Sequence, residues 1–143
     1  MASAGHQLIL GLVARRMRQK GYEIVSFDGS EALIGTTHFK VPPIIRRHRP
    51  DAIGVNLQNR RICIGEAKTS KDLHSSRTKE QFADYSSLFI RNNEQLCELV
   101  IGIPRSSESK LKQMLETLGI ANNPNVSYVW MPDEFLREND HDI

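Results

Sequence analysis

The stretch RRICIGEAKT, residues 60–69, decides the fold and the chemistry that we expect of this chain. Its apolar first half is typical of a β-strand, but it ends in Glu66, Ala67 and Lys68. Alternate residues of a strand point to the same face, so Glu66 and Lys68 share one face and Ala67 points to the other. Burying a carboxylate or an ammonium group is costly unless the charge is paired or put to use. We therefore expect these two charges to serve a site at the end of the strand.

A tight turn joins this strand to another strand that precedes it. The segments DAIGVNL (51–57) and RICIGEA (61–67) flank a short polar turn, as in a β-hairpin. Because fourteen residues separate Asp51 from Glu66, pairing across the turn brings both carboxylates level at one end of the hairpin. The hairpin thus predicts two carboxylates and the Lys68 ammonium group at one end of a sheet.

Helices and further strands surround this hairpin in the sequence. Apolar residues recur at helical spacing after Ser3, a suitable N-cap, and the pattern stops at Gly21. The unbroken apolar run ELVIGI favours a strand that is buried on both faces. We expect a single α/β domain over residues 1–143, in which helices flank a mixed sheet. The expected elements are a helix at 4–20, an alternating strand at 22–28, a loop-rich stretch at 29–50, the hairpin, a helix within 71–90, a strand at 96–104, a helix at 106–118, a strand at 126–130 and an acidic end.

Composition places the chain among ordinary globular proteins. Hydrophobic residues make up 39% and charged residues 25% of the sequence. No apolar run approaches the roughly 20 residues that a membrane span needs, and the opening MASAGH lacks the pattern of a secretory signal. Cys63 and Cys97 are typical of small buried residues in a reducing compartment. We therefore expect a cytoplasmic protein that has no membrane partner.

The positive charges are concentrated in the middle of the chain. The formal net charge is +2, yet residues 38–79 hold ten lysines and arginines against three acids, and the last eleven residues hold five acids and one arginine. A basic segment of this kind favours a polyanionic partner, and an ordinary solvated surface is the alternative. Seven basic residues flank the expected site, as a groove that follows a phosphate backbone requires: Lys40, Arg46, Arg47, Arg49, Lys71, Arg77 and Lys79.

The carboxylates of Asp51 and Glu66 and the carbonyl of Ala67 are hard oxygen ligands. Such ligands suit Mg²⁺ or Mn²⁺, which keeps water in its other positions. A bound cation lowers the pKa of its water and stabilises charge on a phosphoryl group, and Lys68 can orient that water or stabilise the oxyanion. The pattern Asp–x14–Glu–x–Lys therefore predicts a site of phosphodiester hydrolysis. The alternative is a simple ion pair at the rim of the sheet.

Pro50-Asp51, followed by Glu66-Ala67-Lys68 in a helix–strand–hairpin–helix–strand order, resembles the PD-(D/E)xK nuclease superfamily. The resemblance covers residues 4 to about 104. In addition, QFADY, from Gln81 to Tyr85, is similar to the QxxxY motif of the RecB-like branch. The resemblance implies a restriction-endonuclease-like core and metal-dependent cleavage of DNA. It also implies that Asp51 and Glu66 ligate the metal, that Lys68 is catalytic, and that Gln81 and Tyr85 support the site.

Some positions depart from the family pattern or allow a structural interpretation. Many relatives carry an acidic metal ligand in the first helix, and residues 4–20 contain none. RecB-like members use a histidine there, which makes His6 a candidate ligand, with Glu23 as a substitute. Gln81 also fits a capping box that begins at Thr78. Tyr85 lies on an apolar helical stripe and fits a core position equally well.

The leading hypothesis is a deoxyribonuclease that depends on Mg²⁺ or Mn²⁺ and uses Asp51, Glu66 and Lys68. The alternative is a catalytically silent DNA-binding or assembly subunit that keeps the nuclease fold. A third possibility is a structural α/β domain with a chance ion pair at the sheet rim. A nuclease domain of this size cuts both strands of a duplex most easily as a homodimer, so a homodimer is a further expectation.

Overall fold

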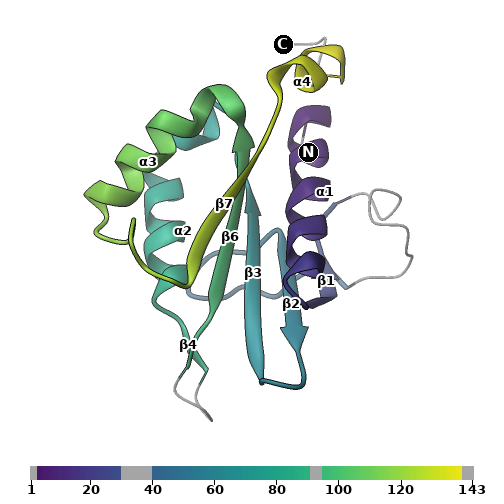
Figure 1. The fold of residues 1–143 in the computed structure, drawn as a ribbon, viewed down its shortest axis with the longest axis vertical. Coiled ribbons are helices and arrows are strands. Elements are labelled where there is room, and N and C mark those ends of the chain that lie inside the picture. The colour runs from purple at the N-terminus through teal and green to yellow at the C-terminus, as the bar shows by residue number, and fades with distance from the viewer. Residues whose placement is uncertain (1–2, 30–39, 91–94, 140–143) are drawn as a thin grey trace.

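The computed structural model describes residues 3–29, 40–90 and 95–139. This part of the chain forms an α/β structure in which helices flank a five-stranded mixed sheet (Figure 1). Helix α1 covers one face of the sheet, and α2 and α3 cover the other. The elements are α1 (Ala4–Gln19), β1 (Glu23–Phe27), β2 (Ala52–Asn56), β3 (Arg61–Ala67), α2 (Ser76–Ser86), β4 (Phe89–Ile90), β5 (Gln95–Leu96), β6 (Glu98–Pro104), α3 (Glu108–Thr117), β7 (Val126–Met131) and α4 (Asp133–Asn139), with single 3-10 turns at Asp72–His74 and Arg105–Ser107.

The strand order is β1-β2-β3-β6-β7. Strands β1, β2 and β3 pair antiparallel, whereas β6 pairs parallel with both β3 and β7. The hairpin register joins Ala52 to Gly65, which confirms that Asp51 and Glu66 lie level at one end of the hairpin. Since β3 and β6 are parallel, their carboxyl ends meet at the same edge of the sheet. This edge is where the predicted site lies.

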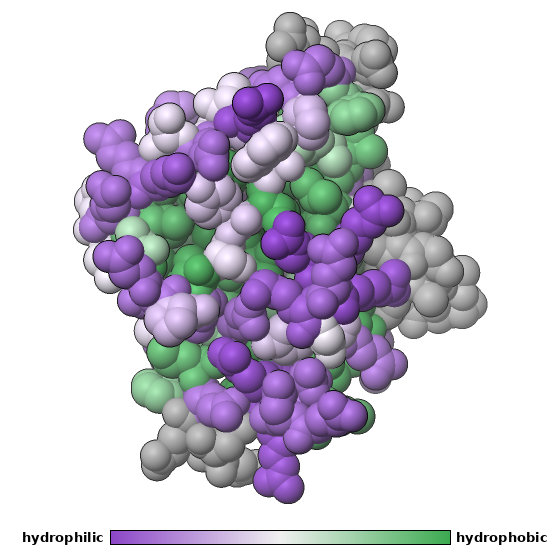
Figure 2. All heavy atoms as spheres, in the orientation of Figure 1, coloured by the Kyte–Doolittle hydropathy of each residue, from purple (hydrophilic) through white to green (hydrophobic). Residues whose placement is uncertain are grey.

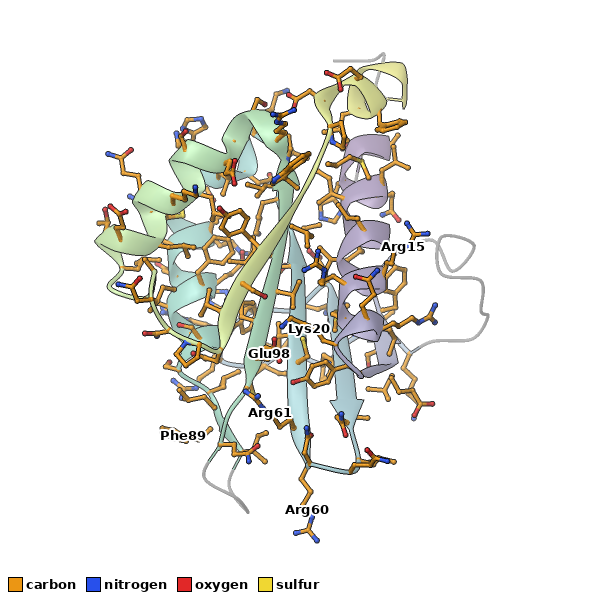
Figure 3. The ribbon with its side chains drawn as sticks, in the orientation of Figure 1. Arg15, Lys20, Arg60, Arg61, Phe89 and Glu98 are labelled. Carbon is orange, nitrogen blue, oxygen red and sulfur yellow. The ribbon has the colours of Figure 1, made fainter. Side chains whose placement is uncertain are left out.

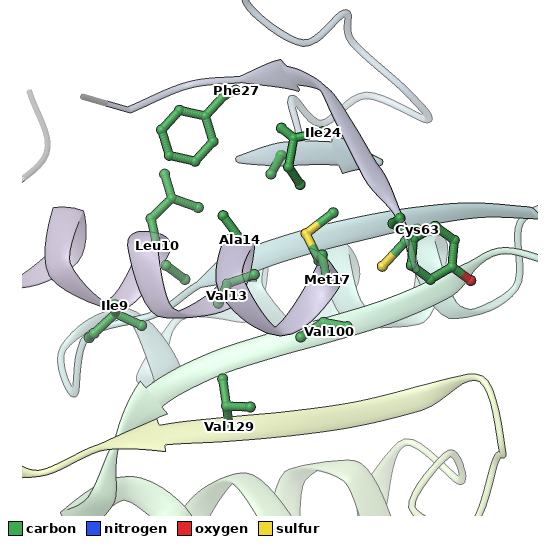
Figure 4. Close-up of a cluster of buried hydrophobic side chains, with 13 residues drawn as sticks. Ile9, Leu10, Val13, Ala14, Met17, Ile24, Phe27, Cys63, Val100 and Val129 are labelled. Atoms are coloured by element: carbon green, nitrogen blue, oxygen red, sulfur yellow. The ribbon is translucent and has the colours of Figure 1, made fainter. Parts of the chain in front are cut away.

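Helix α1 packs closely against the middle of the sheet. Its residues Ile9, Val13 and Met17 are fully buried against the strands (Figure 4). The approach is close because Gly65 in β3 and Gly102 in β6 carry no side chain; a Cβ on Gly65 would lie 2.7 Å from side-chain atoms of α1. Such a contact is shorter than van der Waals packing permits. Glycine at these two places therefore permits the close packing of α1 on β3 and β6.

The other face of the sheet carries a second apolar cluster. Phe82 of α2 and Leu111 of α3 are fully buried with Ile64, Leu99 and Ile101 from the strands. The run 98–104 is buried throughout, as expected of a central strand with helices on both sides. Hydrophilic side chains cover the outer surfaces of the helices in Figure 2, and hydrophobic ones show between them.

Two local features differ from the expected pattern. Strict alternation placed Ile24 and Phe27 on opposite faces, but both are buried in the same cluster, because a β-bulge between Ile24 and Ser26 shifts the register. The acidic end forms a short helix, Asp133–Asn139, that packs on α1. Of the loop-rich stretch 29–50, residues 30–39 lie outside the described residues.

Other expectations hold. Cys63 and Cys97 are buried and unpaired, as predicted for small core residues. Within the described ranges, no helix has the length and hydropathy needed to cross a membrane.

Candidate active site

A pocket of about 230 Å³ lies at the carboxyl end of β3. Its walls come from the first turn of α1, the chain that enters β2, the end of β3 and the start of α2. Segments that are far apart in the sequence therefore contribute to one polar cavity. Eight of the residues singled out from the sequence line it: His6, Arg49, Asp51, Glu66, Ala67, Lys68, Arg77 and Gln81.

The carboxyl groups of Asp51 and Glu66 face each other in this pocket. Glu66 is 1% exposed, and its Oε1 has no hydrogen-bond partner among the described residues. Burial, together with the neighbouring Asp51 carboxylate, raises the pKa of Glu66 well above its ordinary value. Burial acts to raise the pKa of Asp51 as well, but hydrogen bonds from His6, Glu66 and the Ala67 amide outweigh it, so that this pKa is lowered. Protonation is therefore favoured at Glu66 over Asp51, whereas a bound cation would favour the ionised form of both groups.

Asp51, which directly precedes β2, is held by β3 and by α1. Its Oδ2 accepts a hydrogen bond of 2.9 Å from the Ala67 amide and lies 3.5 Å from Nε2 of His6. His6 comes from the first turn of α1 and is 15% exposed. Burial lowers the pKa of His6, but Asp51 outweighs burial and raises it overall. The structure thus brings His6 to the predicted site as a partner of Asp51.

Lys68 is positioned by helix α2. Its Nζ donates a hydrogen bond to Oε1 of Gln81 at 2.5 Å, and Gln81 is only 6% exposed. The capping-box interpretation of Gln81 is wrong, because α2 begins at Ser76 and its N-cap is Ser75, whose hydroxyl accepts a hydrogen bond from the Thr78 amide. Gln81 therefore lies in the second turn of α2, where its side chain is available to hold Lys68.

Tyr85 lies behind the pocket and does not line it. Its side chain is fully buried in the apolar cluster, and its hydroxyl has no hydrogen-bond partner within the described part of the chain. Burial and the nearby Glu66 carboxylate raise the pKa of this hydroxyl, so it stays protonated. Tyr85 packs like a core residue, and its supporting role in the site stays a prediction.

The seven basic residues do not form one group. Arg49 and Arg77 line the pocket. Arg47 lies 3.2 Å from Asp84 and 3.7 Å from Glu80, so it is paired with α2. The remaining four are exposed at positions outside the pocket lining: Lys40, Arg46, Lys71 and Lys79.

Three residues in the pocket wall were not assigned to the site from the sequence: Asp72, Ser75 and Thr78. They form a hydrogen-bonded connection between β3 and α2. The Thr78 hydroxyl donates to the Asp72 carbonyl at 2.6 Å, and the Thr69 hydroxyl donates to the Asp72 carboxylate at 3.0 Å. The available signal was the serine that precedes the helical run, a typical N-cap.

The residues present fit a partly formed magnesium site. Across residues 3–29, 40–90 and 95–139, no group of three or more His, Cys, Asp or Glu side chains is arranged to hold a metal ion. Magnesium, however, is often bound by only one or two carboxylates, with water and substrate phosphate completing its shell. Asp51 and Glu66 supply two carboxyl groups in contact, and Oε1 of Glu66, which has no hydrogen-bond partner in the described part of the chain, is available as a metal ligand. His6 as a further ligand stays a prediction, since its Nε2 faces Asp51.

Comparisons of the chain with models of protein families, with curated proteins and with solved structures give no match.

Proposed function

We propose that this chain is a metal-dependent deoxyribonuclease of the PD-(D/E)xK superfamily, in the RecB-like QxxxY branch, with a restriction-endonuclease-like core. One observation carries the proposal: the buried Glu66 carboxyl lies beside Asp51 at the end of a strand, in a pocket where Gln81 holds the Lys68 ammonium group. A purely structural carboxyl pair would be costly in this position, because burial and like charge both oppose its ionisation.

Asp51, Glu66 and the Ala67 carbonyl would hold Mg²⁺ or Mn²⁺ at this site. When bound, the ion would supply a water of lowered pKa and would stabilise negative charge on the phosphoryl group. His6 and the Ala67 amide hold Asp51 in the ionised form that binds a cation. Because Asp51 is anchored by the strand next to it, its carboxylate keeps its orientation when the substrate enters.

Lys68 acts directly on the substrate. An ammonium group has three N–H donors, and Gln81 accepts one of them. The two others are available to orient the attacking water and to stabilise the charge on the pentacoordinate phosphorus group. Arg49 and Arg77 line the same pocket, where their guanidinium groups bind phosphate oxygens next to the cleaved bond.

A catalytically silent DNA-binding or assembly subunit is the second candidate. One observation favours it: among the described residues, no third acidic or histidine side chain is arranged with the two carboxylates to hold a metal ion. Such a subunit would bind DNA through the same arginines and cut nothing. A homodimer stays a prediction for either candidate.

The test is a cleavage assay on labelled single-stranded, duplex and branched DNA with Mg²⁺, Mn²⁺ or EDTA. The variant is Glu66→Gln, and the matched control is Glu116→Gln, an exposed glutamate of α3. We expect metal-dependent cutting that is lost in Glu66→Gln and kept in Glu116→Gln. DNA binding without cutting under every condition would favour the silent subunit, and neither binding nor cutting would contradict both candidates.

A further inference from the structure

Residues 45–48 form a tight turn with an unfavourable backbone. Ile45 and His48 exchange two backbone hydrogen bonds, of 2.7 and 3.0 Å, and enclose Arg46 and Arg47. Both arginines have positive φ, 58° and 84°. A two-residue turn of this kind usually contains Asn or Gly, because a Cβ crowds the backbone in the left-handed region. Two consecutive arginines are therefore stable here only if the surrounding structure holds them.

Three side chains hold the turn against helix α2, and we call them the brace: Arg47, His48 and Asp84. His48 is 3% exposed, and its Nε2 lies 2.8 Å from Oδ2 of Asp84. The Nε of Arg47 lies 3.2 Å from the same oxygen. Burial alone would raise the pKa of Asp84, but the bonds from Arg47 and His48 lower it, so Asp84 is ionised and can only accept. Both neighbours therefore donate to it.

The brace joins the turn to the helix that positions the catalytic lysine. Asp84 lies in α2 three residues after Gln81, which holds Lys68. The His48 ring also meets the Tyr85 ring edge-on, with centroids 5.8 Å apart. Arg49 follows the turn directly and lines the pocket. Helix α2 therefore sets the position of the turn, and with it that of Arg49, and it also holds Lys68 through Gln81.

The two arginines of the turn are used differently. Arg47 is committed to the carboxylates of α2. Arg46 is exposed, and in the part of the chain that the structure describes it makes no ion pair or hydrogen bond. In this strained turn Arg47 supports the turn itself and the neighbouring Arg46 is exposed to solvent. Such an arrangement has no evident structural purpose. It does suit the binding of an anion that approaches along the surface from the pocket.

We propose that residues 45–49 bind the phosphate backbone of the nucleic-acid strand beside the cleaved bond, with Arg46 and Arg49 making the contacts and His48 and Asp84 acting as positioning residues. The proposal rests on the proposed function for the identity of its ligand. It assigns Arg47 to the brace and not to the substrate.

The test neutralises two acids of α2 in turn. For Asp84, simple electrostatics predicts tighter DNA binding, whereas loss of the brace predicts weaker DNA binding. Removing a negative charge near a bound polyanion should strengthen binding. Asp84→Asn should instead weaken binding several-fold, because the turn loses its support, whereas Glu80→Gln should leave binding equal or tighter. Binding is measured with a labelled duplex oligonucleotide in EDTA over a series of salt concentrations, and the melting temperature of each variant is recorded.

Two further variants make the result specific. Arg46→Gln should weaken binding and reduce the slope of log K against log salt by about 0.9, the effect of one lost phosphate contact. Lys112→Gln, an exposed cation of α3, should change neither. Arg47→Gly in the Asp84→Asn background should restore part of the affinity, because glycine adopts a positive φ without support. Among variants that cut DNA, Asp84→Asn should raise KM and leave kcat nearly unchanged.

The outcomes separate this proposal from the nuclease assignment. If Arg46→Gln and Asp84→Asn bind as tightly as the unaltered chain while cutting persists, the nuclease stands and the turn proposal is wrong. If both variants lose binding but no protein cuts DNA, the turn proposal stands and the nuclease assignment fails. An unaltered chain that binds no DNA of any form overturns both.

Discussion

Two glutamates are buried in neighbouring strands of the same sheet, and they have opposite surroundings. Glu98 at the start of β6 is 6% exposed, accepts a hydrogen bond of 2.7 Å from the Tyr22 hydroxyl, and lies 2.5 Å from Nζ of Lys20 (Figure 3). Glu66 at the end of β3 is 1% exposed and faces another carboxyl, with one oxygen unpartnered among the described residues. Both are acids in apolar strands, yet only Glu98 is neutralised by its neighbours.

The contrast separates a buried acid whose charge is compensated by its neighbours from one whose neighbours oppose its charge. Lys20 and Tyr22 supply the positive charge and the donor that make burial of Glu98 tolerable. Glu66 has the like charge of Asp51 nearby, and its pKa is raised for that reason as well as by burial. A group kept in so unfavourable a state is typical of a functional site, where a substrate or a cation completes its environment.

The largest effect that would test this contrast is on catalysis. Lys68→Met removes the ammonium group to which we assign a role in the proposed reaction, and it keeps the length of the side chain. We expect cleavage to fall by about 10² to 10⁴ under single-turnover conditions, the range found when a charge-stabilising group is removed. The melting temperature should change little. Lys112→Met is the control, and a Lys68→Met protein that cuts DNA at a rate near that of the unaltered chain would remove Lys68 from the mechanism.

The next effect is on stability at the opposite end of the sheet. Glu98→Ala leaves the Tyr22 hydroxyl without its acceptor and Lys20 without its counter-charge. We expect a loss of about 2 kcal/mol in the free energy of unfolding, below the value for a fully buried pair because Lys20 is one-third exposed. Urea denaturation measures it. A loss below about 0.5 kcal/mol would show that Glu98 is not held as described.

A smaller effect of opposite sign is expected at Glu66. Because its folded-state pKa is raised, the native protein keeps a proton that the unfolded chain releases, and native stability falls as pH rises through that raised pKa. Glu66→Gln removes this loss. In EDTA at neutral pH the variant should be more stable than the unaltered chain, because glutamine has no charge to bury. The difference should shrink in acid, and a variant less stable at neutral pH would contradict the raised pKa.

The smallest expected effect is stabilisation by the metal itself. At a free Mg²⁺ concentration five times its dissociation constant, binding to the native state adds about 1 kcal/mol to the free energy of unfolding. The shift should appear in the unaltered chain and in Glu98→Gln, and it should be absent in Glu66→Gln. Thermal denaturation with and without EDTA measures it independently of any cleavage. An equal shift in all three proteins would place the cation elsewhere.

Much of the candidate site follows from local pattern. The alternation of RICIGEA and the short turn before it predict the register that makes Asp51 level with Glu66. His6, Gln81 and Arg49 were singled out through motifs or charge, and their places in the pocket required the assembled fold. The capping alternative for Gln81 failed because two serines before Thr78 start the helix earlier than the motif suggested.

By itself, the sequence determined the five strands of the main sheet, the helices α1, α2 and α3, and the hairpin, because these depend on periodicity and on turns between neighbouring segments. It did not predict helix α4 or the short pair of strands β4 and β5. Tertiary structure alone decided which buried acid is paired. Glu98 meets Tyr22 across 76 residues of sequence, and Lys68 meets Gln81 only once α2 has packed on the sheet. The brace of the arginine turn joins segments 36 residues apart. Such contacts depend on the distance at which helices pack on strands, which no local pattern encodes.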